Sequence, residues 1–208
     1  RSIIIKPEDL RYKIFMCHRD KPDLKGTAAL EYIHWGEAQG YHQRPSCRGR
    51  QRWWDLGKRR KAQINANYLV DEVMRFFCKE DGFYVSDNFQ EVHADQSAFW
   101  PLALSSNSSV LQLFANVTGR ANFGGGLMKI QTYEVARLTI VDPCLLNVDA
   151  CKAALQKAGH LELQASDRRA LDEVVFDVLG LTAGEREAVY EAVVTLVRAR
   201  LEKARSVW

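Results

Sequence analysis

The sequence predicts an α+β fold, in which a β-rich part with flanking helices is followed by a small helical C-terminal part. Short runs of aromatic and β-branched residues, separated by turn residues, indicate strands between residues 62 and 141. From Asn147 onward, apolar residues recur at helical spacing. The 208 residues, 47% hydrophobic and 26% charged, are typical of a globular chain that buries a core without disulfides. We therefore expect a mixed α/β domain over residues 1–146 and a helical subdomain over residues 147–208.

The N-terminal part predicts two strands and one helix. Residues 2–5, Ser-Ile-Ile-Ile, indicate a strand or an extended entry that Pro7 stops, and residues 11–16 partly alternate between polar and apolar, as in a half-buried strand. Thr27 is a good helix cap, and Gly40 follows a run of helical spacing, so a helix is expected over residues 27–39.

The middle of the chain predicts a sheet and a helix. Residues 74–78 and 83–86 flank a short polar stretch, which indicates a hairpin with Gly82 at the turn. A helix is expected over residues 102–117. Further strands are expected over residues 89–92, 128–133 and 137–141.

The C-terminal part predicts three helices. The first ends at Gly159, and the second covers residues 167–179. The third begins at Thr182, which forms a capping box with Glu185. Acidic residues on these helices, including Asp172, are expected to lie on solvated faces.

Residues 41–61 differ in character from the rest of the chain. They contain eight Lys and Arg residues and a single acid, Asp55, which gives a net charge of +7. The whole chain carries +3, so the remainder carries −4. Such a concentration of positive charge is typical of a surface that binds a polyanion.

We interpret this segment as a candidate nucleic-acid interface, against the alternative of a solvated basic face. Lysine and arginine neutralise phosphates, and arginine also pairs with guanine edges. For the two tryptophans, anchoring of the loop to the core is favoured over stacking on bases. The candidate residues are Arg44, Arg48, Arg50, Arg52, Trp53, Trp54, Lys58, Arg59, Arg60 and Lys61.

Two further places are candidates for nucleic-acid contact. Gly124 and Gly125 follow Arg120, and a glycine run can hold phosphate through backbone N–H groups, although a simple connection between elements is an equal alternative. Asn88 follows a predicted strand and could read a base edge, but a polar turn is favoured there.

The cysteines and histidines give weak signals. Five cysteines without a C-x-x-C pair do not form a disulfide framework, and a reducing, cytoplasmic setting fits them better. Cys17, His18, His42 and Cys47 could ligate zinc, although buried thiols and surface imidazoles are favoured. No apolar run is long enough to span a membrane, and none forms a secretory signal. The chain begins with Arg1, and we expect it to be a piece of a longer protein.

Several motifs occur in an order that resembles a known family. The sequence is similar to the region that follows the catalytic domain in adenine-specific DNA methyltransferases of the TaqI-like and fused restriction–modification type. The resemblance spans most of the chain, and the shared order carries it. The motifs are Tyr32-Ile33-x-x-Gly36-Glu37, His42-x-Arg44-x-x-Cys47, Arg52-Trp53-Trp54-Asp55-Leu56, Tyr84-Val85-Ser86-Asp87-Asn88-Phe89, Asn107-Ser108, Gly119-Arg120, Gly124-Gly125-Gly126, Leu138-x-Ile140-x-Asp142-Pro143, Leu171-Asp172-x-x-Val175-x-x-x-Leu179-Gly180-Leu181-Thr182 and Arg200-Leu201-x-Lys203-Ala204.

The resemblance implies a target-recognition domain that binds duplex DNA and selects sequence, while the catalytic domain extrudes the target adenine for N6 methylation. The chain lacks an Asn-Pro-Pro-Tyr motif and a glycine motif for the cofactor. We therefore expect no cofactor and no catalytic residue in this fragment, S-adenosylmethionine in the parent enzyme, and the parent's N-terminal methyltransferase domain as a partner. A protein-interaction module and a nuclease fragment are the alternatives.

Overall fold

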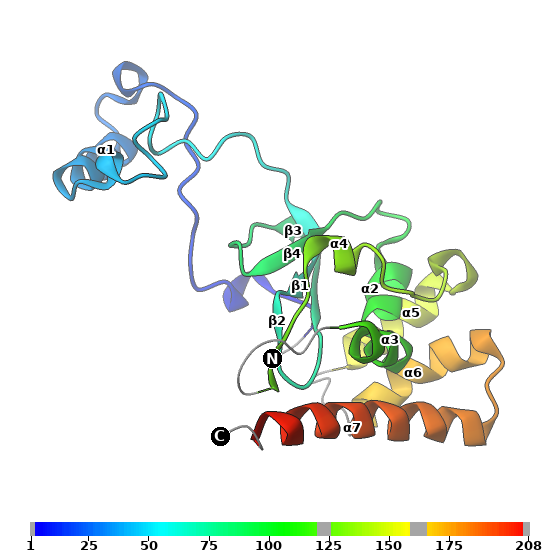
Figure 1. Cartoon of the computed structure of the whole chain (residues 1–208). Coiled ribbons are helices and arrows are strands. Elements are labelled where there is room, and N and C mark those ends of the chain that lie inside the picture. Colours follow the sequence, from blue (N-terminus) through cyan, green and yellow to red (C-terminus); the bar gives the residue numbers. More distant parts are fainter. Residues whose placement is uncertain (1–2, 120–125, 159–165, 206–208) are drawn as a thin grey trace. The chain divides into compact units, whose positions relative to one another are not determined.

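The computed structural model describes residues 3–119, 126–158 and 166–205, and the chain divides into two compact units. The body comprises Arg1–Asp9 and Lys61–Trp208, and the inserted unit comprises Leu10–Arg60. The chain thus leaves the body after its first residues and returns at Lys61 (Figure 1). The division falls at positions other than the expected boundary at residue 146.

The body is built on a three-stranded antiparallel sheet. The strands are β1 (Ala62–Asn67), β3 (Phe76–Phe83) and β4 (Phe89–Val92), in the order β3-β1-β4. Ile4 forms a parallel bridge with Cys78 on the free edge of β3. The expected strand at 89–92 is confirmed. Of the strand or extended entry expected at 2–5, the described residues 3–5 form this bridge.

The hairpin expected around Gly82 is wrong. Residues 76–83 form one strand, and its partner is β1, which lies earlier in the sequence. Ala62 lies opposite Phe83, whereas Ile64, only two residues later, lies opposite Cys78. The extra residues of β3 between these two pairs form a bulge. Gly82 lies in this bulge with φ +70°, where a Cβ atom would come within 2.9 Å of Cβ of Lys61. The glycine therefore serves a close backbone approach and not a turn.

The helix expected over residues 102–117 is two helices. α2 (Phe99–Asn107) is followed by Ser108, which has an extended backbone, and α3 (Ser109–Thr118) begins directly after this serine. The hydroxyl of Ser108 accepts a hydrogen bond from Leu111 N at 3.3 Å, so this serine caps the second helix. Helical periodicity continues across such a break, which is why the sequence did not reveal it.

The second sheet is smaller than the sequence predicts. It pairs β2 (Leu69–Val70) with β5 (Met128–Lys129), and the chain then turns into the short helix α4 (Thr132–Val135). The strand expected over residues 137–141 is wrong, because these residues have no strand partner among the described residues and lead into the 3-10 helix η5 (Pro143–Leu145).

The C-terminal helices agree with the sequence. They are α5 (Val148–Lys157), α6 (Ser166–Leu179) and α7 (Ala183–Arg205). The capping box is confirmed, since Glu185 accepts from Thr182 N at 2.8 Å and Thr182 Oγ1 accepts from Glu185 N at 3.4 Å. Gly159 lies outside the described residues. The helix α5 packs against α2 and α6, while α7 packs against α3. One apolar core joins the sheet to α2, α3, α5 and α6.

Two side-chain amides fasten the broken helix to the chain leading into β3. Asn107 accepts from Phe76 N at 3.1 Å and donates to Phe76 O at 2.9 Å. Gln112 accepts from Met74 N at 3.0 Å and donates to Met74 O at 2.7 Å. Each amide satisfies both backbone groups of one residue, as a neighbouring strand would. All of these groups are buried, so loss of either amide would leave unpaired polar atoms in the core.

Two charged side chains from α6 fill the break at Ser108. Asp172 accepts from Ser109 N and Ser109 Oγ, both at 2.6 Å, and Arg168 donates to Asn107 O at 3.1 Å. Both charged residues are almost fully buried, at 0% and 1% exposure. The expectation that Asp172 is solvated is therefore wrong. Burial raises the pKa of Asp172, and the hydrogen bonds from Ser109 and the charge of Arg168 oppose this rise.

The inserted unit has one main helix. It contains η2 (Lys21–Leu24), α1 (Ala28–Ala38) and η3 (Tyr41–Gln43). The 3-10 helix η1 (Pro7–Asp9) belongs to the body. The predicted helix is confirmed, with Thr27 as its cap and Gly40 in a left-handed conformation, φ +73°, after its end. The strand expected over residues 11–16 is wrong, because these described residues form no regular element.

We predict that Asp172→Ala destabilises the protein by about 3–5 kcal/mol, because it leaves the buried charge of Arg168 without its counter-charge. Urea unfolding measures this change. The control is Asp177→Ala, which removes an exposed acid from the same helix, paired with Arg186 at 2.7 Å. Its cost should stay within about 1 kcal/mol. Equal costs for the two variants would contradict the proposed role of the buried pair.

We also predict that the body folds without the inserted unit. Ile4 and Ile64 pair with Cys78 from opposite sides of β3, so they lie about 10 Å apart, twice the strand spacing. A Gly/Ser linker of about six residues in place of Leu10–Arg60, together with the body residues on either side of it, is long enough to connect Ile4 with Ile64. The shortened chain should unfold in one cooperative urea transition and give dispersed amide resonances. A chain without cooperative unfolding would contradict the division into two units.

Candidate nucleic-acid interface

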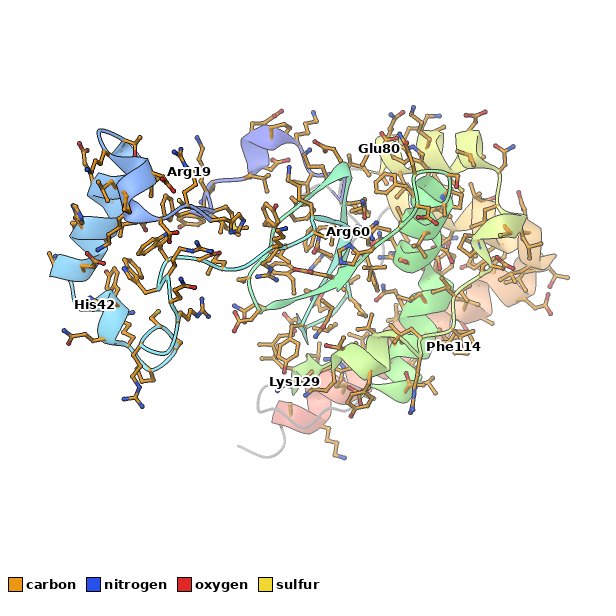
Figure 2. The ribbon with its side chains drawn as sticks, turned by 90° about the horizontal axis from the view of Figure 1, so that it is seen from above. Arg19, His42, Arg60, Glu80, Phe114 and Lys129 are labelled. Atoms are coloured by element: carbon orange, nitrogen blue, oxygen red, sulfur yellow. The ribbon has the colours of Figure 1, made fainter. Side chains whose placement is uncertain are left out.

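The inserted unit has a small hydrophobic core of its own. Cys17, Leu24, Ile33 and Trp54 are buried in it, with other side chains packed around them. The helix α1 therefore presents Ile33 to the loop that carries most of the basic residues. Figure 2 draws the side chains of this unit, with Arg19 and His42 labelled.

Trp53 packs on the helix at Gly36. A Cβ atom at this glycine would lie 2.3 Å from the indole atom Cη2 of Trp53, so a larger residue cannot stand there without displacing the ring. The indole Nε1 of Trp53 donates to Glu37 Oε1 at 3.2 Å. Trp54 is 8% exposed. Both rings thus hold the loop against α1, which agrees with the anchoring role favoured for this pair.

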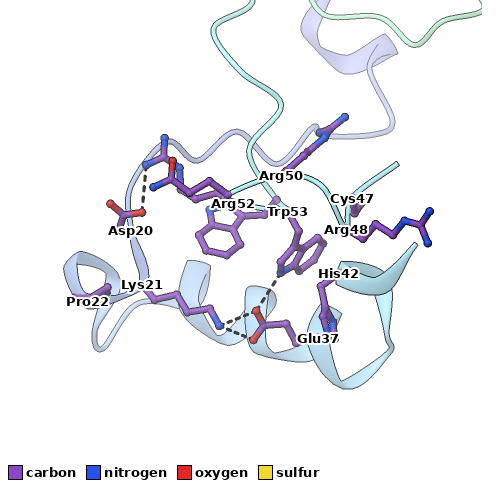
Figure 3. A pocket seen from close by; sticks show the side chains of 12 residues that line it. Asp20, Lys21, Pro22, Glu37, His42, Cys47, Arg48, Arg50, Arg52 and Trp53 are labelled. Carbon is purple, nitrogen blue, oxygen red and sulfur yellow. Dashed lines mark hydrogen bonds and ion pairs between the residues drawn. The ribbon is translucent and has the colours of Figure 1, made fainter. Parts of the chain in front are cut away.

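Glu37 links three parts of the inserted unit. Its carboxylate accepts from Lys21 Nζ at 2.7 Å as well as from Trp53 (Figure 3). Partial burial alone would raise the pKa of Glu37, but the hydrogen bonds from Lys21 and Trp53 outweigh it and lower this pKa. The carboxylate therefore stays charged at neutral pH and holds η2, α1 and the loop together.

Asp55 holds the end of the loop. It accepts from Gly57 N and from His18 Nδ1, each at 2.8 Å, and from Arg52 Nε at 3.0 Å. These contacts lower its pKa, with the Gly57 N–H as the largest cause and His18 next. Arg52 also reaches Asp20 at 3.2 Å. Its charge is thus balanced by two carboxylates, which makes Arg52 part of the scaffold.

The other basic residues of the loop are exposed and less engaged. Arg44 lies 4.4 Å from the ring centre of Tyr41, and Arg50 donates to the backbone oxygen of Asp55 at 3.2 Å. Arg59 is also exposed. Three side chains are exposed without a hydrogen bond or ion pair among the described residues: Arg48, Lys58 and Arg60.

A depression of about 650 Å³ lies between η2, α1 and the loop. Figure 3 shows the guanidinium groups of Arg48 and Arg50 directed away from Glu37 at the side of this depression. The acids Asp20 and Glu37 are already paired with Arg52 and Lys21. Its lining is Asp20, Lys21, Pro22, Glu37, His42, Cys47, Arg48, Arg50, Gln51, Arg52, Trp53 and Trp54. The charges left over are positive, so the surface suits an anionic group.

The two units carry net charges of opposite sign. The inserted unit holds 12 Lys and Arg residues against five Asp and Glu residues, a net charge of +7. The body holds 17 against 21, a net charge of −4. The positive charge is therefore a property of the inserted unit as a whole, although most of it lies in residues 41–60.

The remaining candidates lie elsewhere. Lys61 and Asn88 belong to the body, where Lys61 lies 5.8 Å from the ring centre of Tyr84. Asn88 is exposed in a turn in which Phe89 N donates to Ser86 O at 3.2 Å, as the turn interpretation expects. Three candidates lie outside the described residues: Arg120, Gly124 and Gly125.

No zinc site forms from the candidate ligands. Within residues 3–119, 126–158 and 166–205, no three His, Cys, Asp or Glu side chains gather closely enough to hold a metal ion. His18 is engaged with Asp55, and Cys17 is buried. Over the same described ranges, no helix has the length and apolar character that a membrane crossing requires.

Comparison with known proteins assigns the family. A family model described as "Type II methyltransferase M.Eco57I, C-terminal domain" matches residues 5–176. The chain belongs to this family. No curated protein matches the chain, and no solved structure does. The matched residues include the inserted unit and most of the body, so the family domain comprises both units. The match confirms the resemblance that the ordered motifs indicated.

Sequence reasoning missed the residues that build the scaffold. Gly36, Glu37 and Asp55 stood in the ordered motifs without a role, and the structure gives each of them a contact in the inserted unit. Arg168 and Asp172 are four residues apart, which places them on one helix face. That face also carries Leu171 and Val175, so this spacing was a usable signal of burial.

We predict that Gly36→Ala destabilises the inserted unit by about 1–3 kcal/mol through overpacking against Trp53. The direction of the change in stability is informative, because glycine to alanine inside an ordinary helix stabilises by up to about 1 kcal/mol. Unfolding followed by tryptophan fluorescence measures it. The control is Gly49→Ala, since Gly49 has open space around it. A Gly36→Ala variant as stable as the parent would contradict the packing of Trp53 on α1.

Proposed function

We propose that this chain is the DNA-recognition part of an adenine-specific methyltransferase of a restriction–modification system, and that it binds duplex DNA through the inserted unit. Membership of the M.Eco57I C-terminal family supports the link to a type II methyltransferase. On this proposal, S-adenosylmethionine and methyl transfer belong to an N-terminal catalytic domain of the parent enzyme, which is also the chain's protein partner. The five free cysteines support a reducing, cytoplasmic setting.

The observation that carries the proposal is the exposed positive charge of the inserted unit. Arg48, Lys58 and Arg60 are exposed and have no side-chain partner among the described residues. Phosphate contacts by such residues release counterions from DNA, and this release drives binding. In contrast, Arg52 is held by two carboxylates and contributes to the shape of the loop.

The separation of charge between the units supports the same surface. A phosphate backbone is attracted to the inserted unit, at +7, and repelled by the body, at −4. The arginines on the loop can also pair with guanine edges in the major groove. We propose that Arg50, whose guanidinium group is directed away from Glu37, reads bases.

We predict that the full chain binds duplex DNA with a slope of log K against log salt of about −3 to −4, as expected for roughly four phosphate contacts. The triple variant Arg48→Ala, Lys58→Ala, Arg60→Ala removes three of these contacts. Its slope should be shallower by about 3. Fluorescence polarisation of a labelled random-sequence duplex, titrated at several salt concentrations, measures both slopes.

A matched control separates local contact from net charge. Arg137, Lys157 and Arg198 are exposed residues of the body, without a hydrogen bond or ion pair of their side chains among the described residues. Changing these three to alanine alters the net charge of the chain by the same amount. This control should keep the slope of the parent chain. If the slope of log K against log salt becomes shallower by the same amount in both triple variants, the proposal is wrong. It is also wrong if the chain shows no salt-sensitive binding to any duplex.

A further inference from the structure

The helix α1 carries an exposed pair of stacked aromatic rings. Tyr32 and Trp35 are three residues apart, so they share one face of the helix. Their ring centres lie 5.5 Å apart with 29° between the ring planes. Phe15 continues the row, with its ring centre 4.9 Å from that of Tyr32, and Tyr41 lies 5.5 Å from Trp35 at the other end. We call these four residues the aromatic row.

Tyr32 and Trp35 are not required to close the core of the inserted unit, whereas Phe15 packs against that core. That core contains Ile33 and Trp54 and does not include Tyr32 or Trp35. Tyr32 is 47% exposed and Trp35 is 48% exposed. Exposing so much aromatic surface on one helix face costs hydrophobic free energy, and contiguous patches of this kind mark binding sites.

The charges around the row indicate the class of ligand. Arg44 lies 4.4 Å from the ring centre of Tyr41, at the end of the row. The unit that carries the row has a net charge of +7. Flat aromatic rings beside arginine in a positively charged setting form the surface that binds unpaired nucleotides, because the rings contact bases and the cations contact phosphates. In an intact duplex each base stacks on its neighbours, so its faces are not accessible to these rings.

We propose that the aromatic row binds unpaired nucleobases, in a single-stranded or locally opened stretch of DNA. This inference rests on the proposed DNA binding by the inserted unit, and it adds a second surface with a different preference. The basic residues contact phosphates of any DNA, whereas Tyr32 and Trp35 contact bases only where the duplex is open. The chain therefore binds opened DNA more tightly than intact duplex.

The test compares three DNA substrates with the full chain. They are a duplex, the same duplex with a central unpaired bubble, and a single strand of the same length. The parent chain should bind the bubble about tenfold more tightly than the duplex, as one stacked base contributes. The double variant Tyr32→Leu, Trp35→Leu keeps apolar side chains on the helix but removes the rings. It should lose the preference for the bubble and keep its affinity for the duplex within about twofold.

Two further variants and two measurements on the protein keep the outcomes distinct. Tyr133→Leu removes a half-exposed ring from the body, at 51% exposure, and should change none of the three affinities. Circular dichroism confirms that the double variant is folded, and sedimentation of the parent and the double variant records self-association. A single change, Trp35→Phe, keeps an aromatic ring and should retain most of the preference.

Each result decides one proposal. If the parent binds bubble and duplex equally, or if the double variant keeps the preference, the role of the aromatic row is overturned while duplex binding stands. If the double variant differs only by losing self-association, the row is a protein contact and the inference is again wrong. If no DNA binds at all, the proposed function itself fails.

Discussion

The contact between Trp53 and Gly36 is the constraint on which the inserted unit depends. A loop with seven like charges within residues 41–60 repels itself, and it needs anchors to keep a defined shape. The glycine allows the indole ring to lie directly on α1, and Glu37 binds the indole N–H of the same ring. Asp55 then fixes the end of the loop. With these anchors in place, the remaining cations can point to solvent without unfolding the unit.

In the body, buried polar side chains have the corresponding anchoring role. The helix break at Ser108 leaves backbone groups without helical partners, and Arg168 and Asp172 from α6 bind them. Asn107 and Gln112, on either side of the break, bind the backbone that leads into β3. The break is therefore the point at which sheet, central helices and C-terminal helices are joined. This arrangement explains why the helical C-terminal part packs as a portion of the body.

Local signals in the sequence predicted much of the helical structure, and long-range pairing limited the rest. Thr27, Gly40 and the capping box at Thr182 marked helix ends, because caps depend on neighbouring residues alone. The partner of residues 76–83 is a strand whose identity no local pattern encodes, and so the hairpin around Gly82 was wrong. In the candidate site, the basic residues could be predicted from the density of Lys and Arg in residues 41–61. The pairing of Arg52 with Asp20, 32 positions away, required the fold.

On the proposed function, DNA contacts the inserted unit through its exposed basic residues. Hydrogen exchange of backbone amides, measured with and without a saturating duplex, tests it most directly. The account predicts that DNA slows exchange within residues 44–60, with smaller changes in the body. Protection confined to the body, with exchange in the inserted unit unchanged by DNA, would contradict it.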